Sequence, residues 1–226
     1  MSAIRIAVDA VIFGYDPDDG VSVVLITRKY EPYQGAWALP GGFVLTEESL
    51  EDAVKRELKE ETGISVNYLE QLYTFGQPGR DPRQRIVSIA YYGLVRPKDY
   101  QLLAQTDADD VAWFNINKLP KLAFDHRQIL DAAIKRLRGK LAYEPVGFEL
   151  LDKKFPFSDL EKLYQSVLDS ELDRRNFKKK IMAYGFLEEL NENLQRGAGR
   201  PARLYQFNKK KYFELKERGY NFDLFL

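Results

Sequence analysis

The stretch from Gly42 to Ile64 reads GFVLTEESLEDAVKRELKEETGI, and its acidic residues decide how the first half of the chain is interpreted. At about 100° per residue, a helix here places Glu57 and Glu61 on the same side as the apolar residues Leu50 and Val54. Carboxylates on a buried stripe are costly unless they are paired or bind a metal. The pattern therefore predicts a helix over about 47–62 that holds a hard divalent cation at its buried carboxylates.

The spacing of the acidic residues supports a cation site near the helix end. Glu57, Glu60 and Glu61 stand at i, i+3 and i+4, so their oxygens can converge on one ion. A helix C-terminus carries partial negative charge, which makes uncompensated glutamates unfavourable there. We expect Thr46 to cap the start of the helix and Gly63 to end it. The alternative, a solvated Glu/Lys helix, does not explain the two carboxylates on the apolar side.

These residues resemble the Nudix box, G-x5-E-x7-R-E-U-x-E-E-x-G-U, in which U is a bulky aliphatic residue. Every fixed position is met, by Gly42, Glu48, Arg56, Glu57, Leu58, Glu60, Glu61, Gly63 and Ile64. The resemblance covers about residues 3–140 and implies an α/β fold, the Nudix α/β/α sandwich. The alternation of β-branched runs with helical patterns in this half agrees with that fold.

Nudix enzymes cleave nucleoside diphosphates linked to another group, so the resemblance also implies site residues. Glu57, Glu60 and Glu61 are the expected ligands of Mg²⁺ or Mn²⁺, which neutralises the pyrophosphate and activates a water. The implied catalytic residues are Glu57, Arg56 and Glu60, with Arg56 orienting the glutamates. The extra acid that such enzymes use outside the box has no clear counterpart, and Asp107, Asp109 and Asp110 are the nearest options.

Glycines and arginines around the box are the expected contacts of a phosphorylated ligand. Gly41 and Gly42 allow the backbone to approach phosphate groups closely. Arg80, Arg83 and Arg85 lie in one loop and can clamp a phosphate or carboxylate, although a solvated loop is the alternative.

Composition limits the remaining possibilities. The 226 residues contain no cysteine and one histidine, His126, which excludes disulfides, thiolate chemistry and a histidine-rich metal site. No apolar run approaches the length of a membrane span and no signal peptide is visible. We therefore expect a cytoplasmic protein with no membrane partner.

The second half of the chain predicts a separate module. We expect a Nudix domain over 1–140, a linker and hinge over 141–156, and a smaller winged helix-turn-helix domain over 157–226. Ser158 and Glu161 form a capping box that predicts the start of a first helix, and Asp173 can cap a second. Two extended segments, 187–194 and 202–207, flank a glycine-rich tip and predict the wing.

Positive charge coincides with the two elements of this module that would face DNA. The segment 174–211 contains 11 basic and three acidic residues in a chain of zero net charge. In a helix-turn-helix module the second helix enters the major groove, where arginine and asparagine can read bases and lysine suits phosphates. The expected DNA contacts are Arg174, Arg175, Asn176, Lys178, Lys179, Arg196, Arg200 and Arg203. A small helical module with a solvated basic face is the alternative.

A Nudix box followed by RRNFKKKI and GRPARLY resembles the Nudix-related transcriptional regulators of bacteria. That resemblance implies a homodimer that binds operator DNA and senses a small-molecule effector, either an ADP-ribose-like nucleotide or a pentose sugar. Many such regulators have lost hydrolysis and some keep it. The second hypothesis is therefore a Mg²⁺-dependent hydrolase of ADP-ribose-like compounds with an accessory domain. The effector, the operator and the sign of regulation do not follow from the sequence.

Overall fold

The computed structural model describes residues 3–104, 108–196 and 199–220. The chain divides into two compact units, Met1–Arg136 and Leu137–Leu226, which are described separately. The predicted domain limits at residues 140 and 156 stay a prediction. The stretch predicted as a linker contains the end of a helix, a short 3₁₀ helix and a two-residue strand.

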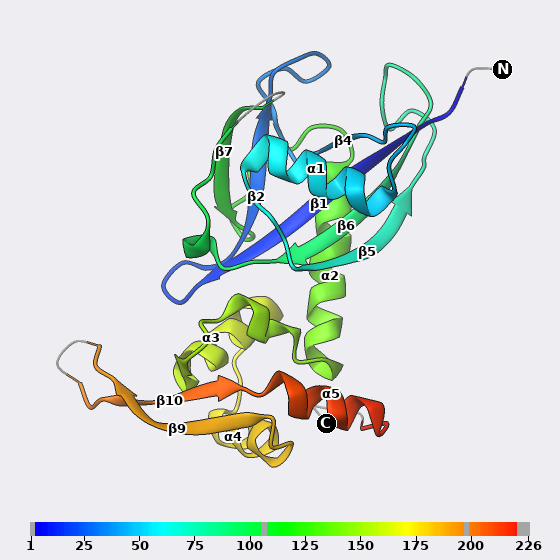
Figure 1. The fold of residues 1–226 in the computed structure, drawn as a ribbon. Helices are drawn as coiled ribbons and strands as arrows, with labels where there is room; N and C mark the ends of the chain where they lie inside the picture. Colours follow the sequence, from blue (N-terminus) through cyan, green and yellow to red (C-terminus); the bar gives the residue numbers. More distant parts are fainter. Residues whose placement is uncertain (1–2, 105–107, 197–198, 221–226) are drawn as a thin grey trace. The chain divides into compact units, whose positions relative to one another are not determined.

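The first unit is built on a mixed sheet (Figure 1), in which β1 lies at the centre with β6 parallel on one side and β2 antiparallel on the other. The order β3-β2-β1-β6-β5 is extended by β4, which pairs with β1, and by β7, which pairs with β2. The strands are β1 (Arg5–Asp16), β2 (Gly20–Arg28), β3 (Trp37–Ala38), β4 (Gly41–Phe43), β5 (Tyr68–Phe75), β6 (Ile86–Leu94) and β7 (Ala108–Asn115).

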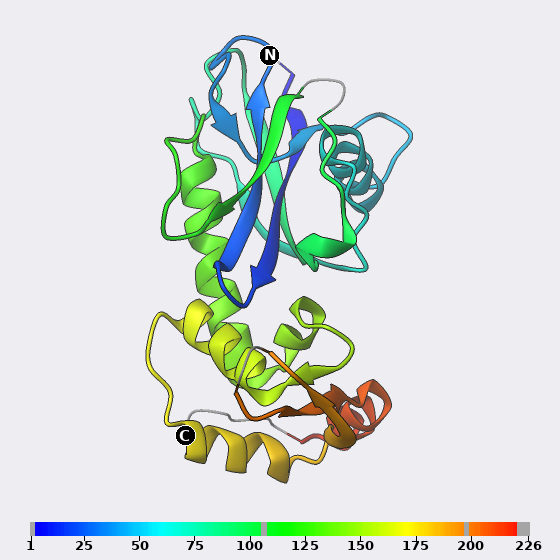
Figure 2. The ribbon, with the colours of Figure 1, turned by 90° about the vertical axis from the view of Figure 1, so that its left-hand side faces the viewer.

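Two helices cover opposite faces of this sheet, α1 (Leu50–Thr62) and the first part of α2 (His126–Tyr143), as Figure 2 shows. The core beneath α1 joins Ala53, Val54 and Leu58 to strand residues such as Val8 and Ile89. The predicted α/β/α sandwich is therefore confirmed. A 3₁₀ turn, η1 (Pro97–Asp99), follows β6.

Helix α1 begins later than the sequence predicted. Its N-cap is Ser49, whose Oγ accepts a hydrogen bond from the backbone N of Asp52 at 3.1 Å, so the expectation for Thr46 was wrong. The residues before Ser49 form a turn instead, closed by Glu48 Oε1, which accepts from the backbone N of Leu45 at 2.8 Å. At the other end the prediction holds, since Gly63 adopts a left-handed conformation with φ of 77°.

Helix α2 continues past Gly139, although a glycine often marks the end of a helix. Leu137 and Leu141 are both buried and stand one turn apart, so the apolar stripe runs across the glycine. Burial of these two leucines outweighs the cost of about 1 kcal/mol that a glycine imposes within a helix.

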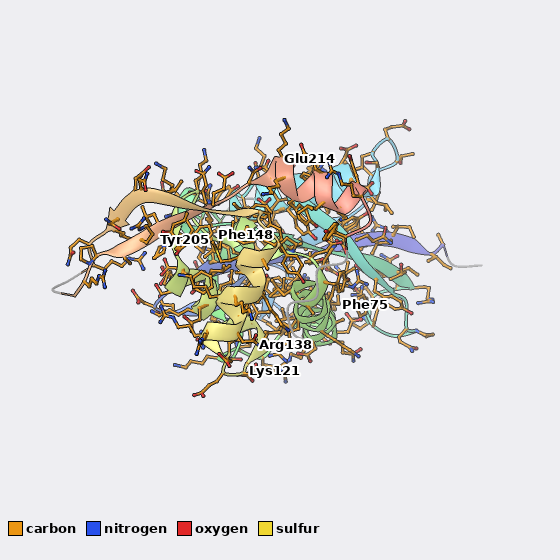
Figure 3. The ribbon with its side chains drawn as sticks, turned by 90° about the horizontal axis from the view of Figure 1, so that it is seen from below. Phe75, Lys121, Arg138, Phe148, Tyr205 and Glu214 are labelled. Atoms are coloured by element: carbon orange, nitrogen blue, oxygen red, sulfur yellow. The ribbon has the colours of Figure 1, made fainter. Side chains whose placement is uncertain are left out.

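The second unit has the predicted winged-helix arrangement, with helix α3 (Phe157–Leu168), helix α4 (Arg174–Ala183) and the hairpin β9 (Leu187–Leu194) and β10 (Ala202–Phe207). The strand β8 (Phe155–Pro156) pairs with β10 and completes a three-stranded sheet. Aromatic side chains form much of its core, which includes Tyr205 on β10 and Phe148 on the 3₁₀ helix η2 (Val146–Leu150), both labelled in Figure 3. Helix α5 (Lys209–Glu217), capped by Asn208, was not predicted.

The caps of the two central helices differ in how well the sequence predicted them. Asp173 caps α4 as expected, accepting from the backbone N of Asn176 at 3.0 Å. The capping box at Ser158 was wrong, because α3 already begins at Phe157 and no side chain caps it. Glu161, the other half of that box, is instead paired with Arg174.

None of the helices in the described parts of the chain is both long and apolar enough to cross a bilayer.

Candidate functional site

The first unit contains a cavity of about 370 Å³ where β1, β4, α1 and the loop after β5 meet. That volume is within the range of small-molecule sites. Six of the predicted site residues line it: Gly41, Gly42, Glu57, Glu61, Arg80 and Arg83. Three others, Arg56, Glu60 and Arg85, are not among the described residues that line the cavity.

The two carboxylates that the helical pattern placed on the apolar side both reach the cavity. Glu61 is only 4% exposed, and its Oε2 accepts a hydrogen bond from the backbone N of Gly41 at 2.8 Å. Glu57 packs against Gly42 so closely that a Cβ on residue 42 would lie 2.3 Å from Oε1. Gly42 therefore gives the Glu57 carboxylate room to face the cavity, and Gly41 holds the Glu61 carboxylate through its backbone N.

Arg56 organises the acidic residues around α1. Its guanidinium contacts Glu48 at 2.7 Å, Glu57 at 2.8 Å and Glu60 at 3.4 Å, and it also donates to the carbonyl of Phe43. The hydrogen bond from Arg56 is the main reason that the pKa of Glu48 is lowered to about 2. Arg56 thus holds Glu48, Glu57 and Glu60 together through ion pairs.

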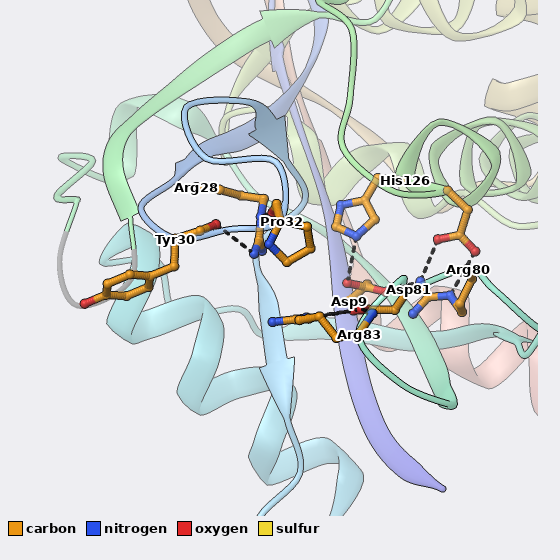
Figure 4. Close-up of polar contacts among 9 residues, drawn as sticks. Asp9, Arg28, Tyr30, Pro32, Arg80, Asp81, Arg83 and His126 are labelled. Atoms are coloured by element: carbon orange, nitrogen blue, oxygen red, sulfur yellow. Dashed lines mark hydrogen bonds and ion pairs between the residues drawn. The ribbon is translucent and has the colours of Figure 1, made fainter.

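A second polar cluster, which the sequence did not reveal, lies on the β1 side of the cavity (Figure 4). Asp9 accepts a hydrogen bond from Ser88 Oγ at 2.5 Å and pairs with Arg80 at 3.3 Å. Arg80 is also held by both oxygens of Asp125, at 2.6 and 2.9 Å. Burial alone would lower the pKa of Arg80, but Asp125 and Asp9 raise it above its usual value.

His126 joins the same cluster at the start of α2. Its Nδ1 accepts a hydrogen bond from the backbone N of Leu39 at 2.9 Å, and its Nε2 lies 3.5 Å from Asp9 Oδ1. Burial lowers the pKa of His126, with the neighbouring Asp9 acting in the opposite direction. The imidazole is therefore neutral at pH 7, with its proton on Nε2.

Further cations and aromatic rings also line the cavity. Arg83 is held by Asp81 at 2.7 Å, and the guanidinium of Arg5 lies 3.6 Å from the ring centre of Phe43. Arg28 donates to the carbonyl of Pro32 and lies over the ring of Phe124. The cavity thus offers both positive groups and ring faces to a ligand, as phosphates and a flat base require.

Glu57 and Glu61 are the residues that fit a divalent cation. They supply oxygen donors one helical turn apart on the wall of one cavity, which suits a hard ion such as Mg²⁺. Within the described ranges, no three His, Cys, Asp or Glu side chains are arranged to hold a metal by themselves. The chain would therefore provide part of a ligand set, and water or ligand oxygens would complete it.

The predicted DNA-facing helix, α4, carries three exposed residues of the expected set, Arg175, Asn176 and Lys179. Arg174 is exposed as well but pairs with Glu161 at 3.3 Å. Lys178 is half-buried, and its Nζ donates to the hydroxyl of Tyr205 at 2.9 Å.

In the hairpin, two of the three predicted cations are paired with carboxylates. Arg196 binds Asp159 at 2.8 Å, and Arg203 binds Glu189 at 3.1 Å. Arg200 is exposed.

Asp9 and Asp125 are site residues that sequence reasoning missed. Asp9 interrupts the apolar run of β1, and a lone carboxylate inside a strand was a usable signal. Asp125 carried no such signal, because an aspartate before a helix reads as an ordinary cap. Of the proposed extra acids, Asp109 and Asp110 are exposed and Asp107 lies outside the described residues.

Comparison with known families matches both units separately. Residues 4–136 match the NUDIX domain model, and residues 147–207 match the NrtR DNA-binding winged helix domain. The chain belongs to the Nudix-related transcriptional regulators. It is accordingly a DNA-binding transcriptional regulator whose Nudix domain is the effector-sensing part.

Two curated relatives match different lengths of the chain. The ADPR responsive transcriptional repressor NtrR of Acinetobacter baylyi is 34% identical over 209 residues, covering 91% of this chain and 82% of the relative. The ADP-ribose pyrophosphatase of Methanocaldococcus jannaschii is 42% identical over 134 residues, covering 59% of this chain and 75% of the relative.

Two solved structures are similar to the chain, one over nearly its whole length and one over its Nudix domain. Shewanella oneidensis NrtR complexed with a 27mer DNA has a TM-score of 0.80 and 32% identity, covering 96% of this chain and 97% of that chain. The NUDIX domain of the same protein complexed with ADP ribose has a TM-score of 0.55 and 39% identity, covering 61% of this chain and 90% of that one.

Proposed function

We propose that this regulator is a homodimer that binds operator DNA through α4 and the β9–β10 hairpin, and that ADP-ribose in the Nudix cavity changes its affinity for that DNA. The observation that carries the proposal is the cavity itself, which is lined both by Glu57 and Glu61 and by Arg80 and Arg83. A pyrophosphate needs positive partners, and a divalent cation bound by the glutamates would add to them.

ADP-ribose is favoured over a free pentose for two reasons. A neutral sugar cannot form ion pairs with the arginines that line the cavity, whereas a diphosphate can. Two relatives also support it: the repressor of A. baylyi is ADPR responsive, and the NUDIX domain of S. oneidensis NrtR forms a complex with ADP ribose.

A dimer is favoured by the geometry of helix-turn-helix recognition. Two recognition helices read half-sites about 34–36 Å apart, so an effector that changes their spacing changes operator affinity. A coupling of 1–3 kcal/mol corresponds to roughly a 5–150-fold change in affinity. Because α2 continues through Tyr143, any hinge within the predicted linker follows that residue.

The test is a titration of an operator complex with ADP-ribose, with arabinose and ribose as controls, followed by fluorescence anisotropy. We expect ADP-ribose to change operator affinity at least fivefold and the free sugars to leave it unchanged. If ADP-ribose binds the protein but DNA affinity does not change, the proposed regulation is wrong.

Hydrolysis is a second candidate function, favoured by the complete Nudix box and by the similarity to an ADP-ribose pyrophosphatase. When bound, the cation would neutralise the pyrophosphate and activate a water. Arg56 would hold Glu57 in place, and Arg80 and Arg83 would bind the phosphates. Release of AMP from ADP-ribose in the presence of Mg²⁺, lost in Glu57→Gln, would establish this activity.

A further inference from the structure

Two acidic residues of α3 are buried in the winged-helix unit, where an uncompensated charge would be costly. The side chains of Asp159 and Glu161 are only 7% and 11% exposed. Both are compensated by arginines of the elements predicted to face DNA, Arg196 after β9 and Arg174 on α4. Helix α3 therefore holds both of these elements through ion pairs.

The pair between Asp159 and Arg196 has the geometry of a specific clamp. The two guanidinium NH groups donate to the two carboxylate oxygens at 2.8 and 3.0 Å. Such paired contacts fix orientation as well as distance. The side chain of Arg196 nevertheless remains 54% exposed, so it is oriented by Asp159 while still facing solvent.

A second connection runs from α4 to the hairpin through Tyr205. Lys178 Nζ donates to the Tyr205 hydroxyl at 2.9 Å, and that hydroxyl donates to Glu189 Oε2 on β9 at 3.1 Å. The ring of Tyr205 packs edge-on against Phe157 of α3, with centroids 5.9 Å apart. This chain of contacts links the recognition helix, both strands of the wing and α3.

We propose that Asp159 and Tyr205 are positioning residues for DNA recognition, which fix the wing relative to α4. The inference rests on the proposed DNA-reading role of these two elements. Neither residue is suited to touch DNA, since Asp159 is negative and Tyr205 is 3% exposed. Each acts through a cation instead, Asp159 through Arg196 and Tyr205 through Lys178. A fixed wing lets base contacts from α4 and backbone contacts from the hairpin form in one register.

The variants Asp159→Asn and Tyr205→Phe test this proposal in the full-length chain. Each removes a charge or a hydroxyl and preserves the shape of the side chain. Affinity is measured by fluorescence anisotropy for two duplexes of equal length, one selected by the wild-type protein from a random-sequence library and one scrambled. Thermal unfolding is measured alongside.

We expect the ratio of selected to scrambled affinity to fall about tenfold in each variant, within the range of typical coupling between sites. Affinity for the scrambled duplex should stay within about twofold, because phosphate contacts do not depend on register. Adding Arg196→Gln to Asp159→Asn should not lower the ratio of selected to scrambled affinity further, because both substitutions break the same ion pair. Asp169→Asn is the matched control, since it removes an exposed charge at the end of the same helix.

Two results would overturn the proposal. Discrimination within twofold of wild type in both variants would show that the contacts do not position the reading elements. An equal loss for both duplexes, accompanied by a lower unfolding temperature, would show that they only stabilise the fold. If the wild-type chain selects no sequence at all, the proposed DNA-reading role is wrong. That outcome can be told apart from failure of the positioning proposal, because it is seen in the wild-type protein before any variant is measured.

Discussion

Gly42 leaves the space that the carboxylate of Glu57 occupies, since a Cβ on residue 42 would lie 2.3 Å from Glu57 Oε1. Gly42→Ala must therefore displace the carboxylate, which is the movable end of a long side chain. We expect a small change in the free energy of unfolding, below about 1 kcal/mol, but loss of the stabilisation that Mg²⁺ or Mn²⁺ confers. Differential scanning fluorimetry with and without the cation measures both effects.

Gly41→Ala is the contrasting variant. There the new Cβ would lie 2.2 Å from the backbone oxygen of Val8, which cannot move without distorting the sheet. We expect this variant to lose about 1–3 kcal/mol of stability whether or not metal is present. Equal behaviour of the two alanine variants would contradict this explanation of the glycine pair.

The double variant Glu57→Gln with Glu61→Gln should abolish the response to divalent cations. At a cation concentration of 100 times Kd, specific binding stabilises a protein by about 2.7 kcal/mol, and the amides remove both carboxylates that α1 contributes to the cavity wall. Glu60→Gln should have a smaller effect, because Glu60 lies outside the cavity lining and is paired with Arg56. A double variant that responds to Mg²⁺ like the wild type would place the cation elsewhere.

Burial of His126 predicts a pH dependence of the Nudix domain. Its pKa is lower in the folded state than in the unfolded chain, so the unfolded state binds the additional proton as pH falls. The stabilisation from the neutral imidazole is complete above the unfolded pKa of about 6.5 and declines below it, by up to about 1.4 kcal/mol per pH unit. His126→Gln should flatten this slope.

Urea unfolding between pH 7.5 and 5.5 measures the slope, and tryptophan fluorescence reports on the right unit because Trp37 and Trp113 both belong to it. The window stays above the range in which ordinary carboxylates titrate. An unchanged slope in His126→Gln would show that another group causes the pH dependence.

The sequence predicted most where one local pattern fixed both fold and chemistry. The acidic helix with Glu57 and Glu61 on its apolar side was recognisable because helical periodicity is a local property. The hairpin limits 187–194 and 202–207 were likewise set by adjacent residues and match β9 and β10.

Contacts between distant segments could not be predicted in this way. The cluster of Asp9, Arg80, Asp125 and His126 joins three parts of the chain, and no local pattern brings them together. The same limit applies to Lys178. Its charge alone led to the prediction that it contacts DNA, whereas in the structure it donates a hydrogen bond to Tyr205. Local charge indicates where cations occur but not which of them are already paired.

DNA recognition should divide between base-reading and phosphate-binding residues of α4. Arg175 and Asn176 are exposed in its first turn and carry the side chains suited to guanine and adenine, whereas Lys179 is suited to a phosphate. Arg175→Ala or Asn176→Ala should cost about 1–3 kcal/mol on the selected duplex and relax its sequence preference. Lys179→Ala should weaken selected and scrambled duplexes alike and lower the slope of log K against log salt by about one. Anisotropy titrations between 50 and 200 mM salt separate the two behaviours, and a uniform loss in all three variants would mean that α4 binds only the DNA backbone.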